Sequence, residues 1–390
     1  MFKRITAIFA VGVSSGIVGL LFTLLLHGVQ RLAYGASGSD FLDKVTATLP
    51  SHRFWVMLGC GVFGALGWWI LRRYLKFQAV KSEELAEKAP KMPFWSTLYS
   101  NVLQIVTIAL GSPLGREGAP REAGALFAAR ISKWIGLDSE HLKLMAACGA
   151  GAGLAAIYTV PLSGALFVVE VILRRFSLGI FLPALLTCLL ATTVVQLALG
   201  SAPQYPVSDF AFSAAWLVGC LCMAPIFWWT GKIFGRVAAK LKSQPPSPNW
   251  KFVLLCILNF AVIGLLAMLF PAILGNGKSA AGLEFSDIPT FYVGIMLLGI
   301  RVLITLTSLA AGAMGGLLTP SVAVGALLGG SLGMAWSWWW PGSPFSSFAL
   351  VGAALFLGAS QRMPVTAVVL IFELTYVWFN VGALKGFLAV

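Results

Sequence analysis

A short polar stretch interrupts an apolar region of the chain and carries side chains that could do chemistry. It reads Gly-Ser-Pro-Leu-Gly-Arg-Glu-Gly-Ala-Pro over residues 111–120, with Arg116 and Glu117 near its centre. An ionisable group inside a membrane costs a few kcal/mol unless it is paired or faces water, so such groups usually mark a functional site. Glu117 could take up and release a proton, and the backbone beside it could bind an anion.

The backbone of this stretch favours a sharp turn followed by a helix start. Gly115 and Gly118 let the chain turn, and Pro120 suits the first turn of a helix that we expect to continue through about Phe127 to Ile131. A helix N-terminus presents amide N–H groups without intrahelical partners and a partial positive charge. The sequence therefore predicts a site that can bind a halide without a full cationic charge.

Glu117 would place a carboxylate at the same helix end. When ionised it competes with the anion, and when protonated it becomes neutral or moves away, so the pattern predicts a proton-coupled gate. The alternative is that Glu117 pairs with Arg116 or Arg121 and only stabilises the turn. A purely structural or receptor role for the protein would leave this charged break unexplained.

The rest of the chain has the composition of a membrane protein. Of its 390 residues 58% are hydrophobic and only 11% are charged, against about a quarter charged in soluble proteins. The net charge of +13 comes from basic residues spread between apolar runs, which suits loops facing an anionic cytoplasmic leaflet. Because no basic stripe or recognition motif accompanies the charge, we expect no nucleic-acid partner.

Neither a metal centre nor an enzyme active site is expected. The three histidines are far apart and the cysteines lie in apolar stretches without a CxxC pair, so no metal or other cofactor is predicted. The chain has no HExxH, no G-x-S-x-G elbow and no histidine near a candidate nucleophile, so we do not expect an enzyme. The histidines are His27, His52 and His141, and the cysteines are Cys60, Cys148, Cys188, Cys220, Cys222 and Cys256.

The charges near the first apolar runs predict the orientation. The run from Ile5 to about Leu26 approaches the length needed to span a bilayer and lacks a convincing cleavage site, so a retained helix is favoured over a signal peptide. Lys3 and Arg4 place the N-terminus in the cytoplasm, and a second run over 54–71 leads back to a basic cluster. The pattern predicts a multi-pass protein with a cytoplasmic N-terminus.

The chain divides near its middle at a polar segment, residues 240–251, which we interpret as a cytoplasmic linker. The first half of the membrane domain is then 1–239 and the second half is 252–390. Residues 161–170 run from Pro to Glu and are matched 203 residues later by 364–373. The break at 111–120 is matched 200 residues later by 311–320, so we infer an internal duplication.

Paired Gly/Pro-interrupted segments in two halves predict a transporter site near the membrane midplane. Several apolar segments are also too short for a simple crossing, which indicates broken or re-entrant helices. Close packing of helices is the alternative explanation for the small residues, but it does not account for the charged pair at one break.

The motif Gly115-Arg116-Glu117-Gly118-x-Pro120 resembles the gating-glutamate motif of the CLC family of anion channels and proton-coupled antiporters. Residues 315–320, Gly-Gly-Leu-Leu-Thr-Pro, resemble its second-half anion-site motif, and the segments 153–161 and 161–170 are also similar to the family. The resemblance extends over almost the whole chain. It implies an all-α polytopic membrane protein with a CLC-type inverted repeat of two halves, broken re-entrant helices and a homodimeric assembly.

The fuller strings at the two breaks look most similar to the fluoride-exporting branch of the family. This resemblance implies a fluoride/proton antiporter that exports fluoride across the bacterial inner membrane, coupled to proton influx. A chloride/proton antiporter or a chloride channel of the same family is the alternative. Val171 stands where the chloride/proton antiporters have a second glutamate, as expected for the fluoride branch and also for channel members.

The resemblance also assigns the site residues. Glu117 is the gating and proton-carrying glutamate, and backbone amides at both breaks coordinate the anion together with the Thr319 hydroxyl. Gln78 lies near the place of the family's anion-coordinating serine, and the alternative is that it is only a polar loop residue. We expect a structural turn at 275–278, the second-half counterpart of that region. The predicted anion-binding residues are Gln78, Gly115, Arg116, Gly118, Leu317, Leu318 and Thr319.

Overall fold

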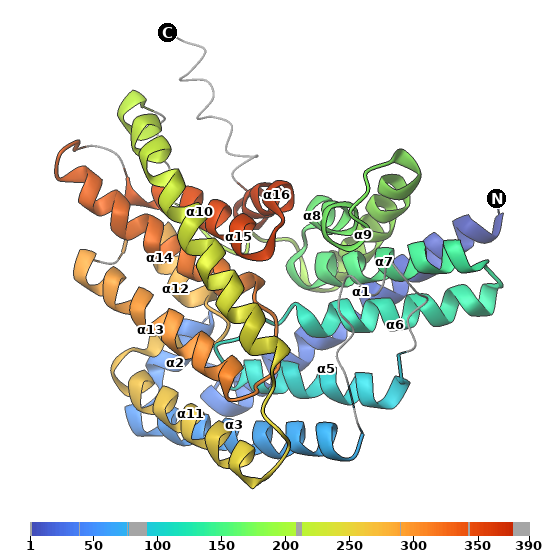
Figure 1. Ribbon diagram of the computed structural model, residues 1–390, viewed down its shortest axis with the longest axis horizontal. Helices are drawn as coiled ribbons and strands as arrows, with labels where there is room; N and C mark the ends of the chain where they lie inside the picture. The colour runs from blue at the N-terminus through green and yellow to red at the C-terminus, as the bar shows by residue number, and fades with distance from the viewer. Residues whose placement is uncertain are drawn as a thin grey trace. The chain divides into compact units, whose positions relative to one another are not determined.

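The structure is a computed structural model of the chain and is almost entirely helical (Figure 1). It describes residues 2–38, 40–75, 77, 92–207, 213–288, 290–341 and 344–376. Within these ranges the chain forms α-helices, one π-helix, one 3-10 helix and one isolated β-bridge, and no strand. The predicted all-α fold is confirmed.

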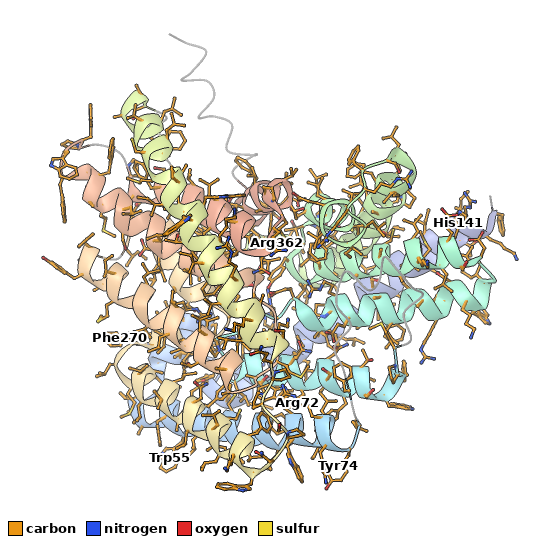
Figure 2. All side chains as sticks on the ribbon, in the orientation of Figure 1. Trp55, Arg72, Tyr74, His141, Phe270 and Arg362 are labelled. Atoms are coloured by element: carbon orange, nitrogen blue, oxygen red, sulfur yellow. The ribbon has the colours of Figure 1, made fainter. Side chains whose placement is uncertain are left out.

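Among the described residues, seven helices are long and apolar enough to cross a membrane. They are α1 (Phe2–Tyr34), α3 (Pro50–Arg73), α9 (Leu178–Leu199), α10 (Ala214–Ser243), α11 (Trp250–Leu269), α13 (Phe291–Ala310) and α14 (Leu318–Ser337). Large apolar side chains such as Trp55 on α3 are exposed at the protein surface, as expected for contact with lipid (Figure 2). The prediction of a multi-pass membrane protein is confirmed.

The remaining helices do not meet these criteria of length and composition, and the segment Pro161–Ile172 changes from α-helix to π-helix within its length. Pro161–Ile172, Phe345–Gln361 and Pro364–Thr375 are apolar but have only 10–17 residues. The other elements are α2 (Phe41–Ala47), α5 (Phe94–Ala109), α6 (Gly118–Ile135), α7 (Ser139–Tyr158), α8 (Pro161–Phe167), the π-helix η1 (Val168–Ile172), the 3-10 helix η2 (Pro271–Ile273), α12 (Lys278–Phe285), α15 (Phe345–Gln361) and α16 (Pro364–Thr375).

The chain forms two compact units. One contains residues 1–29, 66–109 and 116–202, and the other contains 30–65, 110–115 and 203–390. The boundary between the units falls within the charged break, between Gly115 and Arg116, so the two parts of that motif belong to different units. The connection between α10 and α11 falls inside the predicted linker, whose first residues are helical.

In the first unit, α6 and α7 approach each other at glycines. A Cβ on Gly153 would collide with the Pro120 carbonyl, and one on Gly149 would collide with the Gly124 carbonyl. Only residues without a side chain allow this backbone contact. The N-terminal turn of α6 is thereby held against α7.

The second unit repeats this arrangement between α14 and α15. A Cβ on Gly325 would lie 2.6 Å from the Gly352 carbonyl oxygen, and one on Gly352 would lie 2.5 Å from the Gly325 carbonyl oxygen. The backbone between the next two helices is repeated as well: Thr159 has φ 57° and ψ 46°, and Arg362 has φ 56° and ψ 44°. Equal conformations at corresponding positions support the inferred duplication.

Candidate anion and proton site

The first break, between α5 and α6, is buried within the protein. Glu117 immediately precedes α6 and its side chain is 1% exposed. In the described part of the chain it makes no capping hydrogen bond with α6. The helix start predicted beside Glu117, with Pro120 in the first turn, is confirmed, and α6 continues to Ile135.

A tyrosine at the end of α7 holds the Glu117 side chain. The hydroxyl of Tyr158 donates a hydrogen bond to Oε2 of Glu117 at 3.1 Å, and the tyrosine is 4% exposed. Tyr158 is the last residue of α7, which ends at the left-handed Thr159. The sequence analysis did not identify Tyr158, because nothing in its own segment indicates that its hydroxyl reaches a residue 41 positions earlier.

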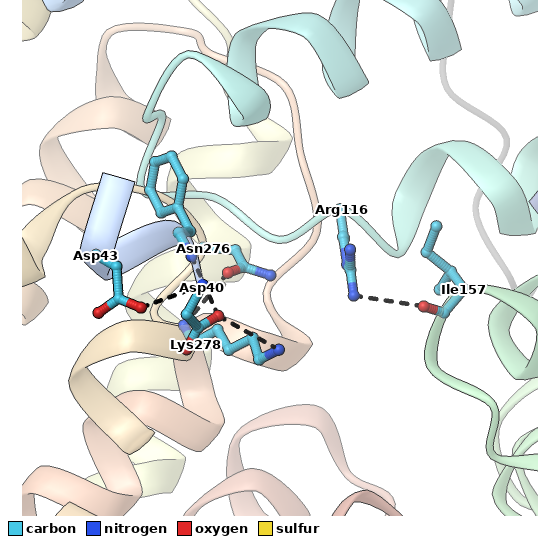
Figure 3. A network of polar contacts seen from close by, with 7 residues as sticks. Asp40, Asp43, Arg116, Ile157, Asn276 and Lys278 are labelled. Carbon is cyan, nitrogen blue, oxygen red and sulfur yellow. Dashed lines mark hydrogen bonds and ion pairs between the residues drawn. The ribbon is translucent and has the colours of Figure 1, made fainter. Parts of the chain in front are cut away.

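The Arg116 side chain is engaged by the same end of α7. Its guanidinium lies 5.0 Å from the centroid of the Tyr158 ring and donates to the Ile157 carbonyl at 3.4 Å (Figure 3). A cation at a helix C-terminus interacts favourably with the helix dipole. Arg116 and Glu117 therefore both contact Tyr158, one through its ring and the other through its hydroxyl.

In the second unit, the ends of both breaks pair through their backbones. The Gly115 amide donates to the Gly316 carbonyl at 2.8 Å, and the Gly316 amide donates to the Gly115 carbonyl at 2.7 Å. Gly115, a predicted anion-binding residue, thus uses its N–H to join the two breaks.

The other predicted second-half residues lie at the start of α14. Leu317 precedes the helix, and Leu318 and Thr319 are its first two residues. Thr319 is 3% exposed, and the first backbone bond of the helix runs from the Ser321 amide to the Leu317 carbonyl at 3.0 Å. The first amides of a helix have no intrahelical partner, so they are the groups that can face an anion.

Two basic residues that the sequence analysis did not assign to the site contact these loops. Arg301 on α13 is 0% exposed and donates to the carbonyls of Ile273 at 2.8 Å, Gly275 at 2.7 Å and Pro113 at 2.9 Å. Lys242 on α10 donates from Nζ to the Gly315 carbonyl at 3.4 Å. A single arginine inside a 20-residue apolar helix was the signal that could have identified Arg301.

The expected turn at 275–278 is present. Gly275 and Gly277 have φ of 74° and 103°, and the Lys278 amide donates to Oδ1 of Asn276 at 3.2 Å. The Lys278 ammonium lies 3.9 Å from Oδ1 of Asp40, as Figure 3 shows.

Of the other residues considered in the sequence analysis, some lie in helices and one is outside the described part of the chain. Gln78 lies outside the described residues. Val171 lies in the π-helix η1 together with Glu170, and Glu373 lies in α16. Single-turn π-helices are rare and often occur near functional sites.

Comparison with known proteins agrees with the fold. The family model described as "Voltage gated chloride channel" matches residues 61–384. The chain is 27% identical to "Voltage-gated ClC-type chloride channel ClcB" of Citrobacter koseri over 96% of this chain and 91% of that protein. It is 25% identical to "Putative chloride channel protein ClcB-like" of Ralstonia nicotianae over 92% of this chain and 87% of that protein.

Two solved structures share the fold. A slow cyanobacterial Cl-/H+ antiporter matches with a TM-score of 0.81 and 21% identity, over 96% of this chain and 89% of that one. A CLC-type fluoride/proton antiporter matches with a TM-score of 0.76 and 20% identity, over 95% and 89%. With the family model covering most of the sequence, and with this fold and these motifs, the chain belongs to the voltage-gated chloride channel (CLC) family of anion transport proteins.

Proposed function

We propose that this protein exchanges an anion for protons and that Glu117 is the mobile gate. The observation that carries the proposal is the position of the Glu117 carboxyl. It is buried beside the N-terminus of α6, bound by the Tyr158 hydroxyl and not used to cap the helix. A carboxyl held in this way can leave its place without unwinding α6.

The protonation state of Glu117 couples the two ions. When ionised, the carboxylate is attracted to the positive end of α6 and competes with an anion for that field. When protonated, it is neutral and gives up this attraction, so the anion can take the place and the proton can move with the side chain. Proton uptake and release at a Glu117 oxygen therefore couple the two movements.

The anion is held mainly by backbone groups in this proposal. The amides of Arg116, Gly118, Leu317 and Leu318 and the Thr319 hydroxyl supply the donors, while Gly115 shapes the site through its bond to Gly316. The Arg116 guanidinium is held at the end of α7, so the residue acts through its backbone. Gln78 is proposed as a further side-chain donor.

Fluoride is the proposed anion, exported from a bacterial cell by a homodimer in the inner membrane with a cytoplasmic N-terminus. The strings at both breaks support fluoride, because they resemble the fluoride-exporting branch. Chloride is the second candidate, because the relatives from Citrobacter koseri and Ralstonia nicotianae are named as chloride channels.

Flux from proteoliposomes tests the proposal. Vesicles loaded with fluoride or chloride are diluted into anion-free buffer while an ion electrode and a pH electrode record both movements. Fluoride efflux with stoichiometric proton uptake, and much slower chloride efflux, is the expected result. Equal chloride flux assigns the protein to the second candidate, and anion flux without proton movement contradicts antiport. In Glu117→Gln, proton movement driven by the anion gradient should disappear, and its persistence would exclude Glu117 as the carrier.

A further inference from the structure

A second carboxyl is buried within the second unit and is not used by the mechanism above. Glu284 lies on α12, which is outside the seven membrane-capable helices and packs against α14 and α15 (Figure 1). Its side chain is 0% exposed. Neither carboxyl oxygen has a hydrogen-bond partner among the described residues.

The surroundings of Glu284 form a small polar site in an otherwise apolar core. A Cβ on Gly294 would lie 3.0 Å from Oε1 of Glu284 and 2.9 Å from Oγ of Ser331, so these two oxygens face the same point. Ser331 is also fully buried, and its hydroxyl has no partner in the described part of the chain. A Cβ on Gly330 would collide with Oε2 of Glu284, so α13 and α14 both leave room for the carboxyl by presenting glycine.

An unpaired carboxylate in such a place is strongly disfavoured, whereas the neutral acid is tolerated and its O–H can donate to a neighbouring oxygen. Burial, and to a smaller extent the nearby Asp287, raise the pKa of Glu284 to about 8. The protonated form is then the resting form near neutral pH, and the group still loses its proton within a pH range that cells reach.

The charged groups around Glu284 are few. The helices α14 and α15 contain no titratable side chain, and α13 contributes Tyr292 and Arg301. Arg301 binds three backbone carbonyls. Asp287 follows α12 and Lys278 begins it. The Tyr205 ring packs on Phe285. Among these groups, Asp287 is the one that raises the pKa of Glu284.

Asp287 lies two residues beyond the end of α12, and its side chain is partly exposed. It is three residues beyond Glu284, and its Oδ1 accepts a hydrogen bond from the Ser346 amide at 2.7 Å. Trp338 and Trp339 follow directly after α14 and are 65% and 80% exposed. Exposed tryptophans of this kind mark membrane–water interfaces. Ser331 lies two turns before them, roughly 10 Å along the helix.

We propose that Glu284 is a second proton-binding site of the transporter, loaded from water at the Asp287 end of α12. Loading forms an O–H bond on a Glu284 oxygen and breaks one in hydronium, which leaves water. The Ser331 hydroxyl, whose oxygen faces the same point as Oε1 of Glu284, is the proposed acceptor for the O–H of the neutral acid. The inference rests on the proposed proton-coupled function and adds to it a proton site in the second half of the chain.

Parallel flux measurements on Glu284→Gln, Glu284→Asp and Glu140→Gln test this role. Glu140 is an exposed carboxyl in the first turn of α7 and serves as the matched control. In Glu284→Gln, proton flux should fall by at least about tenfold, as on loss of a proton-transferring group, while anion flux stays within about twofold. Glu284→Asp should recover part of the proton flux, and Glu140→Gln should match the unmodified protein.

A purely structural Glu284 would change thermal stability and leave the proton-to-anion ratio unaltered, and that result would overturn the inference. Infrared spectroscopy gives an independent readout: a protonated-acid carbonyl band should be present at neutral pH, disappear on alkalinisation and be missing in Glu284→Gln. Absence of that band in the unmodified protein also overturns the inference. If Glu284→Gln does not fold, Glu284→Asp carries the test through a shifted band and a shifted pH midpoint.

The two proposals fail differently in these experiments. Anion flux without any proton flux in the unmodified protein removes antiport, and with it the role of Glu284. Coupled flux in the unmodified protein with an unchanged ratio in Glu284→Gln removes only the role of Glu284.

Discussion

Gly115 and Gly316 are joined by two backbone hydrogen bonds, in which each amide donates to the other's carbonyl at 2.8 and 2.7 Å. They come from corresponding breaks in the two halves of the chain, and both are buried. The pairing ties the loop that ends just before Arg116 to the loop that leads into Leu317.

Adding a methyl group beside this bridge should destabilise the protein. A Cβ on Gly315 would lie 2.5 Å from the Leu114 Cβ, so Gly315→Ala forces the two loops apart. Overpacking of this kind costs about 1–3 kcal/mol, and the melting temperature in detergent should fall accordingly. Gly299→Ala is the control, since a Cβ there meets nothing within 4 Å. Equal melting temperatures for the two variants would show that the loops yield without cost.

Removing the Tyr158 hydroxyl should loosen the proposed gate, Glu117. Tyr158→Phe keeps the ring under Arg116 but deletes the hydrogen bond to Glu117. Hydrogen bonds to charged groups contribute about 1.5–3 kcal/mol, so anion flux at neutral pH should rise by about tenfold or more with coupling retained. Tyr99→Phe on α5 removes a hydroxyl bound at 3.5 Å to the Gly67 carbonyl and should leave flux unaltered. Unchanged or slower flux in Tyr158→Phe would mean that the hydroxyl does not restrain Glu117.

Arg301 should be required for folding because its guanidinium binds three carbonyls at once. In Arg301→Met these buried acceptors lose their donors, at about 1–3 kcal/mol for each unsatisfied group. Arg301→Lys should recover only part of the stability, since an ammonium cannot reproduce the planar fork. Thermal unfolding in detergent measures both variants against Arg236→Met, where the arginine is exposed. A melting temperature for Arg301→Met equal to that control would contradict the anchoring role.

The start of α7 should weaken in acid. Asp138 accepts hydrogen bonds from the His141 amide at 2.9 Å and from its ring Nδ1 at 2.6 Å (His141 is labelled in Figure 2). These bonds, the amide first, hold the pKa of Asp138 below its usual value. A carboxyl whose folded pKa is lowered contributes stability above its unfolded pKa and loses that contribution as the pH falls through the folded pKa.

Amide hydrogen exchange in the first turn of α7 should therefore accelerate below about pH 4, after correction for intrinsic rates. Asp138→Ala should show the faster exchange already at neutral pH and little further change in acid. Identical exchange in both proteins across this pH range would show that Asp138 does not cap the helix.

Local features of the sequence were enough to predict the class of protein and the positions of the breaks. Long apolar runs with few charges admit only a membrane protein, and the clustered glycines and prolines at 111–120 and 311–320 coincide with breaks between helices. The helix start beside Glu117 followed from backbone preferences of single residues, and the turn at 275–278 was expected as the second-half counterpart of the basic-loop region. The structure confirms both of them.

The partners of the buried polar groups were decided only by the tertiary structure. Tyr158 reaches Glu117 across 41 residues, and Arg301 reaches Pro113 across 188. Glu284 faces Ser331 only because Gly294 and Gly330 bring three helices together. The local sequence around Tyr158, Arg301 or Glu284 is the same whether or not a distant group contacts the side chain. Their roles depend on which distant carbonyl or carboxyl the fold brings within hydrogen-bonding distance, and no local pattern encodes that distance.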